Sequence, residues 1–170
     1  MGVYLEGYME VEHVRLEIPE YRDDDVGEIA KKKGEFAFRI IKRPLIVDDT
    51  AFSIDALNGF PGPYAAYVQN TIGNSGVLKL MSGIEDRNAH FETAIAYVDH
   101  QGVRIFRGRI NGTIVPERGD EGFGYDPIFE WEGRTLAELP MKEKSRISHR
   151  ARALSAFRKW IGEERAGSLG

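Results

Sequence analysis

Apolar and polar residues alternate along the first third of the chain in patterns that predict both strands and helices. Residues 11–18 alternate with period two and predict a strand that ends at Pro19. Residues 26–41 have helical spacing, with Ile29 and Ile40 near one face, and the three aspartates directly before them are suited to cap that helix. Residues 45–47 form a short apolar run, which is typical of a strand buried on both faces, and Asp48 and Asp49 follow it.

The middle of the chain is rich in β patterns, and its end is helical. Residues 76–81 predict a short helix, and residues 91–98 and 103–106 predict two strands joined by the hairpin sequence DHQG. Residues 110–115 continue the β pattern, and residues 145–164 have apolar positions at the spacing of one long helix. The combination predicts an α/β fold, with a mixed, twisted central sheet, flanking helices and two lobes around a cleft.

Length and composition narrow the class of protein. The 170 residues fit one domain, which we place at residues 1–165, followed by a flexible tail at residues 166–170. The chain has no cysteine, which excludes a disulfide scaffold, a thiolate zinc site and a cysteine nucleophile, and suits a reducing cytoplasm. A net charge of −4 without an aromatic-interleaved basic stripe argues against nucleic acid as a partner. No apolar run is long enough to span a membrane, so we expect no membrane partner.

The first candidate site is the sequence Asp48-Asp49-Thr50 at the end of the buried strand. In open α/β sheets, ligands bind at the carboxyl ends of strands. Mg²⁺ prefers one or two carboxylates together with phosphate oxygens and water, and a carboxylate here could also take a proton from an attacking water. The alternative is a polar turn that leaves the strand.

The second candidate is the loop GDEGFGYDPIF at residues 119–129. Its glycines would let the backbone approach a ligand closely, and Phe123 and Tyr125 offer faces on which a flat base could stack. Asp126 offers a carboxylate to ring N–H groups. The alternative is a hairpin turn whose aromatic side chains belong to the core.

The third candidate is the basic segment KEKSRISHR at residues 142–150. Unpaired N–H groups at the start of a helix attract anions and carbonyl oxygens, and Ser148, His149 and Arg150 would project from that first turn. The alternative is a solvated, positively charged helix start.

The three segments in this order resemble the inosine triphosphate pyrophosphatase family, which acts on deaminated purine nucleotides. The resemblance rests on LIVDDTAFSIDALNGFPGPYAAY, GFGYDPIF and EKSRISHR, and it covers most of the chain. It implies an elongated α/β fold that works as a homodimer and requires Mg²⁺. The implied reaction is attack of water on the α-phosphoryl group of inosine or xanthosine triphosphate, which releases pyrophosphate and a monophosphate.

The resemblance also implies a role for individual residues. Asp49 corresponds to the proton acceptor and a metal-binding acid, Glu28 to a second metal-binding acid, and Asp48 is a further candidate ligand. The substrate-binding positions implied are Thr50, Lys33, Phe123, Gly124, Tyr125, Asp126, Lys144, Ser148, His149 and Arg150. Of these, His149 and Arg150 would contact the base.

One feature of the family pattern is missing. Family members open with a strand and a Thr/Ser-Gly-Asn-x-x-Lys loop that cradles the triphosphate, whereas residues 1–5 here correspond to the end of the first helix. This difference favours an alternative function, a catalytically impaired nucleotide-binding homodimer. A third possibility, the Maf-like class of nucleotide pyrophosphatases, lacks the Ser-His-Arg helix start that this chain has.

Overall fold

A twisted sheet of six strands organises the part of the chain that the computed structural model describes, residues 10–167. The strands are β1 (Leu45–Ile54), β2 (Pro61–Gly62), β3 (Asn88–Asp99), β4 (Gly102–Ile114), β5 (Phe129–Trp131) and β6 (Arg134–Thr135). They lie in the order β2-β1-β3-β4-β5-β6, and every neighbouring pair is antiparallel. The prediction of an α/β fold around a twisted sheet is confirmed, whereas the predicted mixed sheet is antiparallel throughout residues 10–167. The cleft between two lobes stays a prediction.

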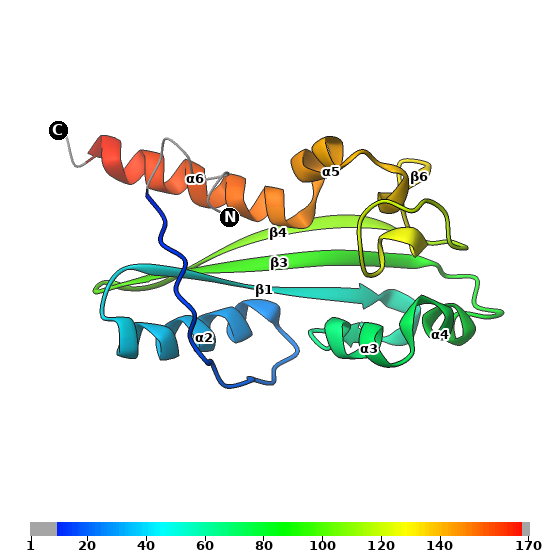
Figure 1. Ribbon diagram of the computed structural model, residues 1–170, viewed down its shortest axis with the longest axis horizontal. Coiled ribbons are helices and arrows are strands. Elements are labelled where there is room, and N and C mark those ends of the chain that lie inside the picture. The colour runs from blue at the N-terminus through cyan, green and yellow to red at the C-terminus, as the bar shows by residue number, and fades with distance from the viewer. Residues whose placement is uncertain (1–9, 168–170) are drawn as a thin grey trace.

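Within residues 10–167, five α-helices flank this sheet. They are α2 (Val26–Ile41), α3 (Ala65–Thr71), α4 (Gly73–Leu80), α5 (Met141–Ile147) and α6 (His149–Gly167). In Figure 1, α2 lies against one face of the long β1–β3–β4 ladder and α6 against the other, whereas α3, α4 and α5 gather at the end near β2 and β6. No helix among residues 10–167 is long and apolar enough to cross a membrane.

Helix α2 has the bounds that the sequence pattern predicts, and an ion-pair network fixes its beginning. The Asp25 carboxylate caps the helix by accepting a hydrogen bond from the Gly27 backbone N–H at 2.6 Å. The Arg107 guanidinium on β4 binds the same carboxylate at 2.7 and 2.9 Å and also binds Glu92 at 2.6 Å. A side chain at position 27 would lie 2.1 Å from the Arg107 Nη2 atom, so the guanidinium packs directly on the glycine.

Two apolar clusters cover the opposite faces of the ladder. On one face, Val26 and Ala30 of α2 pack on three small residues, Ala51, Ala94 and Ala96. On the other face, Ala153, Leu154 and Phe157 of α6 pack on Ile95. Because successive strand residues point to opposite faces, neighbouring positions in the part of the ladder between these helices face α2 and α6 in turn.

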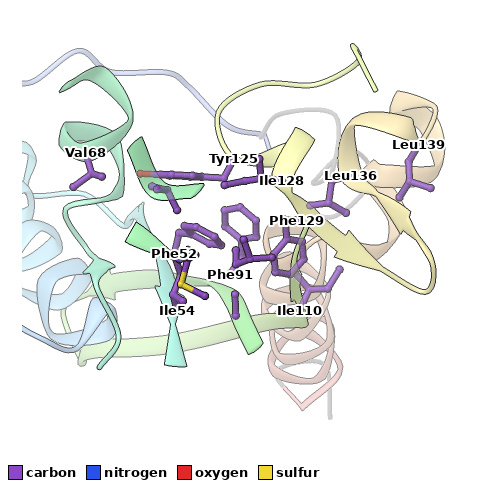
Figure 2. Close-up of a cluster of buried hydrophobic side chains, with 14 residues drawn as sticks. Phe52, Ile54, Val68, Phe91, Ile110, Tyr125, Ile128, Phe129, Leu136 and Leu139 are labelled. Atoms are coloured by element: carbon purple, nitrogen blue, oxygen red, sulfur yellow. The ribbon is translucent and has the colours of Figure 1, made fainter. Parts of the chain in front are cut away.

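The largest cluster lies at the α3–α5 end of the molecule (Figure 2). Its centre is aromatic: Phe52 lies 4.6 Å from Phe91 and 4.3 Å from Tyr125 between ring centroids. Ile110, Ile128, Phe129, Leu136 and Leu139 enclose these rings and are almost completely buried. This cluster joins the loop at residues 119–129 to the ends of β1, β3 and β4.

The predicted final helix is in fact two helices. Ser148 has an extended backbone (ψ 158°) and separates α5 from α6, and its Oγ accepts a hydrogen bond from the Ala151 backbone N–H at 3.2 Å. Ser148 therefore acts as a helix cap, and the spacing of apolar residues did not reveal the break because it continues across it. Helix α6 runs to Gly167, two residues beyond the predicted domain boundary at residue 165, and residues 168–170 lie outside the described part.

The strand predicted at residues 11–18 is wrong. This segment is extended coil without a sheet partner in the described chain, Val14 is 43% exposed, and Val11 packs instead against the cluster under α6. Alternation alone does not make a strand when no neighbouring strand supplies backbone hydrogen bonds. The other β predictions are confirmed with different bounds. Residues 103–106 and 110–114 belong to one strand, β4, paired with β3 across the predicted hairpin, and Val115 lies beyond its end. The strand predicted at residues 45–47 continues to Ile54, so Asp48 and Asp49 lie within it and not after its end, and residues 45–47 are half-buried and not buried on both faces. Residues 1–5 lie outside the described residues.

Candidate active site

Strand β1 divides the acidic pair between the two faces of the sheet. The Asp48 carboxylate forms an ion pair with Arg150, which lies at the start of α6, and its Oδ2 atom is 3.0 Å from Arg150 Nη2. The Asp49 carboxylate, on the opposite face, is hydrogen-bonded to the ammonium of Lys33 on α2. Two consecutive residues of one strand therefore connect the helices that carry the predicted base-binding and phosphate-binding groups.

The edge of β1 next to these acids is open within residues 10–167. Strand β3 pairs with the whole of β1 on one side, whereas β2 pairs only with Phe52 and Ser53 on the other. Backbone groups between Leu45 and Ala51 on that side have no strand partner in the described chain. A ligand that reaches around this edge could contact Asp48 and Asp49 at the same time.

Burial changes the acidity of Asp49. Removal of water from this carboxylate raises its pKa above the ordinary value, and the neighbouring charge of Asp48 adds to the rise, while the hydrogen bond and charge of Lys33 oppose it. Desolvation is the largest contribution, so the net direction is upward even though the carboxylate has a cationic partner. A raised pKa makes Asp49 a stronger proton acceptor than an exposed aspartate.

The three acids predicted to bind metal do not converge. Glu28 is exposed on α2, on the side away from the buried Val26 and Ala30, and Asp48 is held by Arg150 on the other face. Accordingly, the described residues contain no group of three or more acidic or histidine side chains that could hold a metal ion. A magnesium ion that takes most of its ligands from phosphate and water needs only one or two carboxylates, and the half-buried Asp49 fits that requirement.

On the α6 face, His149 is placed by an aromatic stack. Its ring lies 4.8 Å from the Phe91 ring at an angle of 13°, and Phe91 continues through Phe52 to Tyr125. Burial, together with the charges of Arg150 and Lys144, lowers the pKa of His149 to about 4. The imidazole is therefore neutral at physiological pH, and its buried Nδ1 atom has no hydrogen-bond partner within residues 10–167.

Thr50 lies on the same face as Asp48, beneath the start of α6. Its hydroxyl is 2.8 Å from the hydroxyl of Thr93, which is directly opposite on β3. Thr50 is half-buried and Thr93 is completely buried. Asp48, Thr50, His149 and Arg150 thus lie on the same side of the sheet, and the contact of His149 and Arg150 with a base stays a prediction.

The loop at residues 122–126 presents one exposed ring and one buried ring. Phe123 is 77% exposed, with the Lys144 ammonium 4.4 Å from its ring centroid, whereas Tyr125 is buried and donates a hydrogen bond to the Ala65 carbonyl at 2.6 Å. Phe123 therefore offers a free face for stacking a base and Tyr125 supports the loop from below. Tyr125 is also the start of the stack that ends at His149.

Asp126 has an internal role in this structure. Its buried carboxylate is paired with the buried ammonium of Lys144 and accepts a hydrogen bond from the Phe123 backbone N–H at 2.9 Å. The same oxygen, Oδ2, lies against the loop backbone, since a side chain at Gly122 would lie 2.3 Å from it. The carboxylate predicted to meet the base thus fixes the loop to α5, and its direct contact with a ligand stays a prediction.

Several residues of this surface were not singled out by the sequence. Phe52, Phe91 and Thr93 looked like ordinary strand residues, and their spacing carries no sign that they align with His149 and Thr50. Gln69 and Asn74 lie on α3 and α4, and both contact the Gly124 carbonyl. Only the pairing of strands and the packing of distant segments reveal these positions.

The amino-acid sequence also matches a known protein family. The model of the Ham1 family matches residues 4–160 of the sequence. The chain belongs to the Ham1 family. This agrees with the resemblance drawn from the three motifs, because the family's related proteins carry names that describe the same chemistry.

Among related proteins of the Ham1 family, the dITP/XTP pyrophosphatase of Saccharolobus solfataricus is 47% identical over 156 residues, covering 90% of this chain and 81% of that protein. The dITP/XTP pyrophosphatase of Methanopyrus kandleri is 48% identical over 163 residues, covering 94% and 87%. Among solved structures, the Staphylococcus aureus Ham1 protein has a TM-score of 0.83 at 29% identity, covering 88% of this chain and 82% of that chain.

Proposed function

We propose that this protein hydrolyses deaminated purine nucleoside triphosphates, such as those of inosine, deoxyinosine and xanthosine, to the monophosphate and pyrophosphate. Its relatives in the Ham1 family at 47 and 48% identity are named dITP/XTP pyrophosphatases. These names favour an enzyme over a binding protein that lacks catalysis. Hydrolysis would remove such nucleotides from the pool.

The observation that carries the proposal is the division of Asp48 and Asp49 on β1. Asp48 is bound to Arg150 on the face with His149, and Asp49 is bound to Lys33 on the face with α2. A nucleotide that lies across the open edge of β1 would place its base near His149 and its phosphates near Lys33. His149 and Arg150, which would recognise the base, thus lie on the Asp48 side of β1, and Asp49, which would accept the proton, faces the other side.

In the reaction, a water oxygen attacks the α-phosphorus, the bond to the β-phosphate oxygen breaks, and pyrophosphate leaves. Asp49 accepts the proton of the water. The Lys33 ammonium then remains beside the site and compensates negative charge on phosphate oxygens. Asp49 would also hold Mg²⁺, which would neutralise negative charge on the phosphates and lower the pKa of the attacking water.

Base selection follows from the donors on the α6 face. Hypoxanthine and xanthine carry an oxygen acceptor at position 6, where adenine carries an amino donor. The guanidinium of Arg150 has only donors, and the neutral His149 ring can donate from one nitrogen. An adenine amino group would leave these donors unpaired, and sites of this kind discriminate by roughly 10⁴.

The test is release of pyrophosphate from ITP, dITP, XTP, GTP and ATP, with and without Mg²⁺. We expect hydrolysis of ITP, dITP and XTP at a kcat/KM well above that of ATP, and loss of hydrolysis when EDTA removes the metal. The matched variant Asp49→Asn keeps the size of the side chain and removes its basicity. Equal hydrolysis of ATP and ITP would refute the proposed selectivity, and binding of ITP without turnover would support the nucleotide-binding alternative.

We also propose that the protein is a homodimer located in the cytoplasm. The family resemblance supports the dimer, as do the exposed apolar side chains of Phe60, Tyr64, Tyr67 and Ile72 around α3. The absence of cysteine suits a reducing compartment. Sedimentation equilibrium tests the dimer directly, since a single species of one chain's mass at micromolar concentration would contradict it.

A further inference from the structure

The backbone carbonyl of Gly124 receives two side-chain amides from distant parts of the chain. Asn74 Nδ2, near the start of α4, donates to it at 3.0 Å, and Gln69 Nε2, near the end of α3, donates at 3.3 Å. These residues precede Gly124 by 50 and 55 positions. Two separate helices thus hold one carbonyl oxygen of the loop that presents Phe123.

This loop has few other means of holding its shape on the α3–α4 side. Gly122 and Gly124 have positive φ angles of 78° and 63°, a conformation that glycine adopts without strain. Phe123 is 77% exposed, so core packing does not fix its ring. On the α5 side the loop is bound by Asp126 and Lys144, as described above, and on the α3 side by the Tyr125 hydroxyl and the two amides.

The two amides leave their own oxygen atoms unsatisfied. Gln69 Oε1 and Asn74 Oδ1 are both buried, and neither has a hydrogen-bond partner among residues 10–167. Burying a polar atom without a partner is unfavourable, so an apolar side chain of similar size would stabilise the fold at least as well at either position. The contribution of these amides therefore lies in where they hold the Gly124 carbonyl.

We propose that Gln69 and Asn74 are positioning residues that fix the Gly124 carbonyl and, through it, the ring of Phe123 at the base-binding surface. The inference rests on the proposed function, because Phe123 matters for binding only if a flat base stacks there. The two donors share one acceptor. Either amide alone holds the carbonyl, and loss of both frees the carbonyl while Asp126 and Tyr125 still hold the rest of the loop.

The test uses the single variants Gln69→Leu and Asn74→Leu, the double variant and a control in the complete chain. Steady-state hydrolysis of ITP gives KM and kcat separately, and hydrogen exchange of the backbone amides at residues 122–126 in ligand-free protein reports the loop without substrate. Thr71→Val is the matched control, because the Thr71 hydroxyl donates to the Tyr67 and Val68 carbonyls of its own helix and not to the loop at residues 122–126.

In the double variant, KM for ITP should rise about tenfold, the factor expected for one lost hydrogen bond, while kcat changes less than about twofold. Exchange at residues 122–126 should become faster. Each single variant should raise KM less than about threefold and should keep or increase the midpoint of thermal unfolding, and Thr71→Val should behave as the unaltered protein.

Three results would overturn the inference. The first is a double variant with unchanged KM and unchanged exchange. The second is a loss of thermal stability in both single variants together with a fall in kcat, which would indicate a structural role. The third applies if the double variant does not fold. The double variant Gln69→Glu with Asn74→Asp, which replaces both donors by carboxylates of the same shape, is then measured in its place, and unchanged exchange at residues 122–126 overturns the inference. If the unaltered protein does not hydrolyse ITP, the proposed function fails, but the exchange comparison still tests the contact.

Discussion

The neutral, buried state of His149 predicts a specific dependence of stability on pH. The pKa of His149 is about 4 in the folded chain, because burial and the charges of Arg150 and Lys144 disfavour the imidazolium. An exposed histidine in the unfolded chain has a pKa of about 6.5. Below pH 6.5 the unfolded chain therefore binds a proton that the folded chain does not, and the free energy of unfolding decreases as the pH falls.

The magnitude follows from these two pKa values. At pH 5 the unfolded histidine is almost fully protonated and the folded one is about one-tenth protonated, which corresponds to a loss of about 2 kcal/mol. This is an upper bound, because His149 is partly exposed and water reduces the penalty of its charge. The loss is absent above about pH 7.5 and stops growing once the pH is below about 4.

The assay is urea denaturation of the unaltered protein and the variant His149→Gln, each at pH 5.0 and pH 7.5. Glutamine keeps a polar side chain and does not titrate, so groups common to both proteins cancel in the comparison. The unaltered protein should lose up to about 2 kcal/mol more than the variant between the two pH values. An equal loss in both proteins, within about 0.5 kcal/mol, would show that His149 is not held neutral by its surroundings.

Four further predictions concern other parts of the structure. Asp49→Asn should reduce kcat for ITP at least about a hundredfold without lowering the urea midpoint, because burial already disfavours its charge. Lys144→Met leaves the buried Asp126 carboxylate unpaired and should cost about 3–5 kcal/mol in urea unfolding. Gly108→Ala places a methyl group 2.0 Å from the His149 carbonyl of α6, which should cost about 3 kcal/mol in the same assay, and an unchanged midpoint would contradict the packing. Tyr125→Phe removes one hydrogen bond to Ala65, and thermal denaturation should show a loss of about 1 kcal/mol.

Local patterns were sufficient where an element is stabilised by its own residues. The bounds of α2 follow from its helical spacing and from the Asp25 cap, and the β3–β4 hairpin follows from two β-rich runs joined by a short turn. The segment at residues 11–18 shows the limit of this reasoning, because a strand depends on a neighbour that the segment does not contain. The break at Ser148 shows the same limit for helices, since apolar spacing continued across it.

The sequence by itself determined the family and supplied the candidate groups: an acidic pair that follows a short apolar run, a glycine-aromatic loop and a basic segment. The tertiary structure alone decided which of these groups meet. It placed Asp48 with Arg150 and Asp49 with Lys33, turned Glu28 outward, and brought Gln69 and Asn74 to the Gly124 carbonyl. The physical reason is that strand alternation and helix packing set the direction of a side chain, and both depend on contacts between residues far apart in the chain.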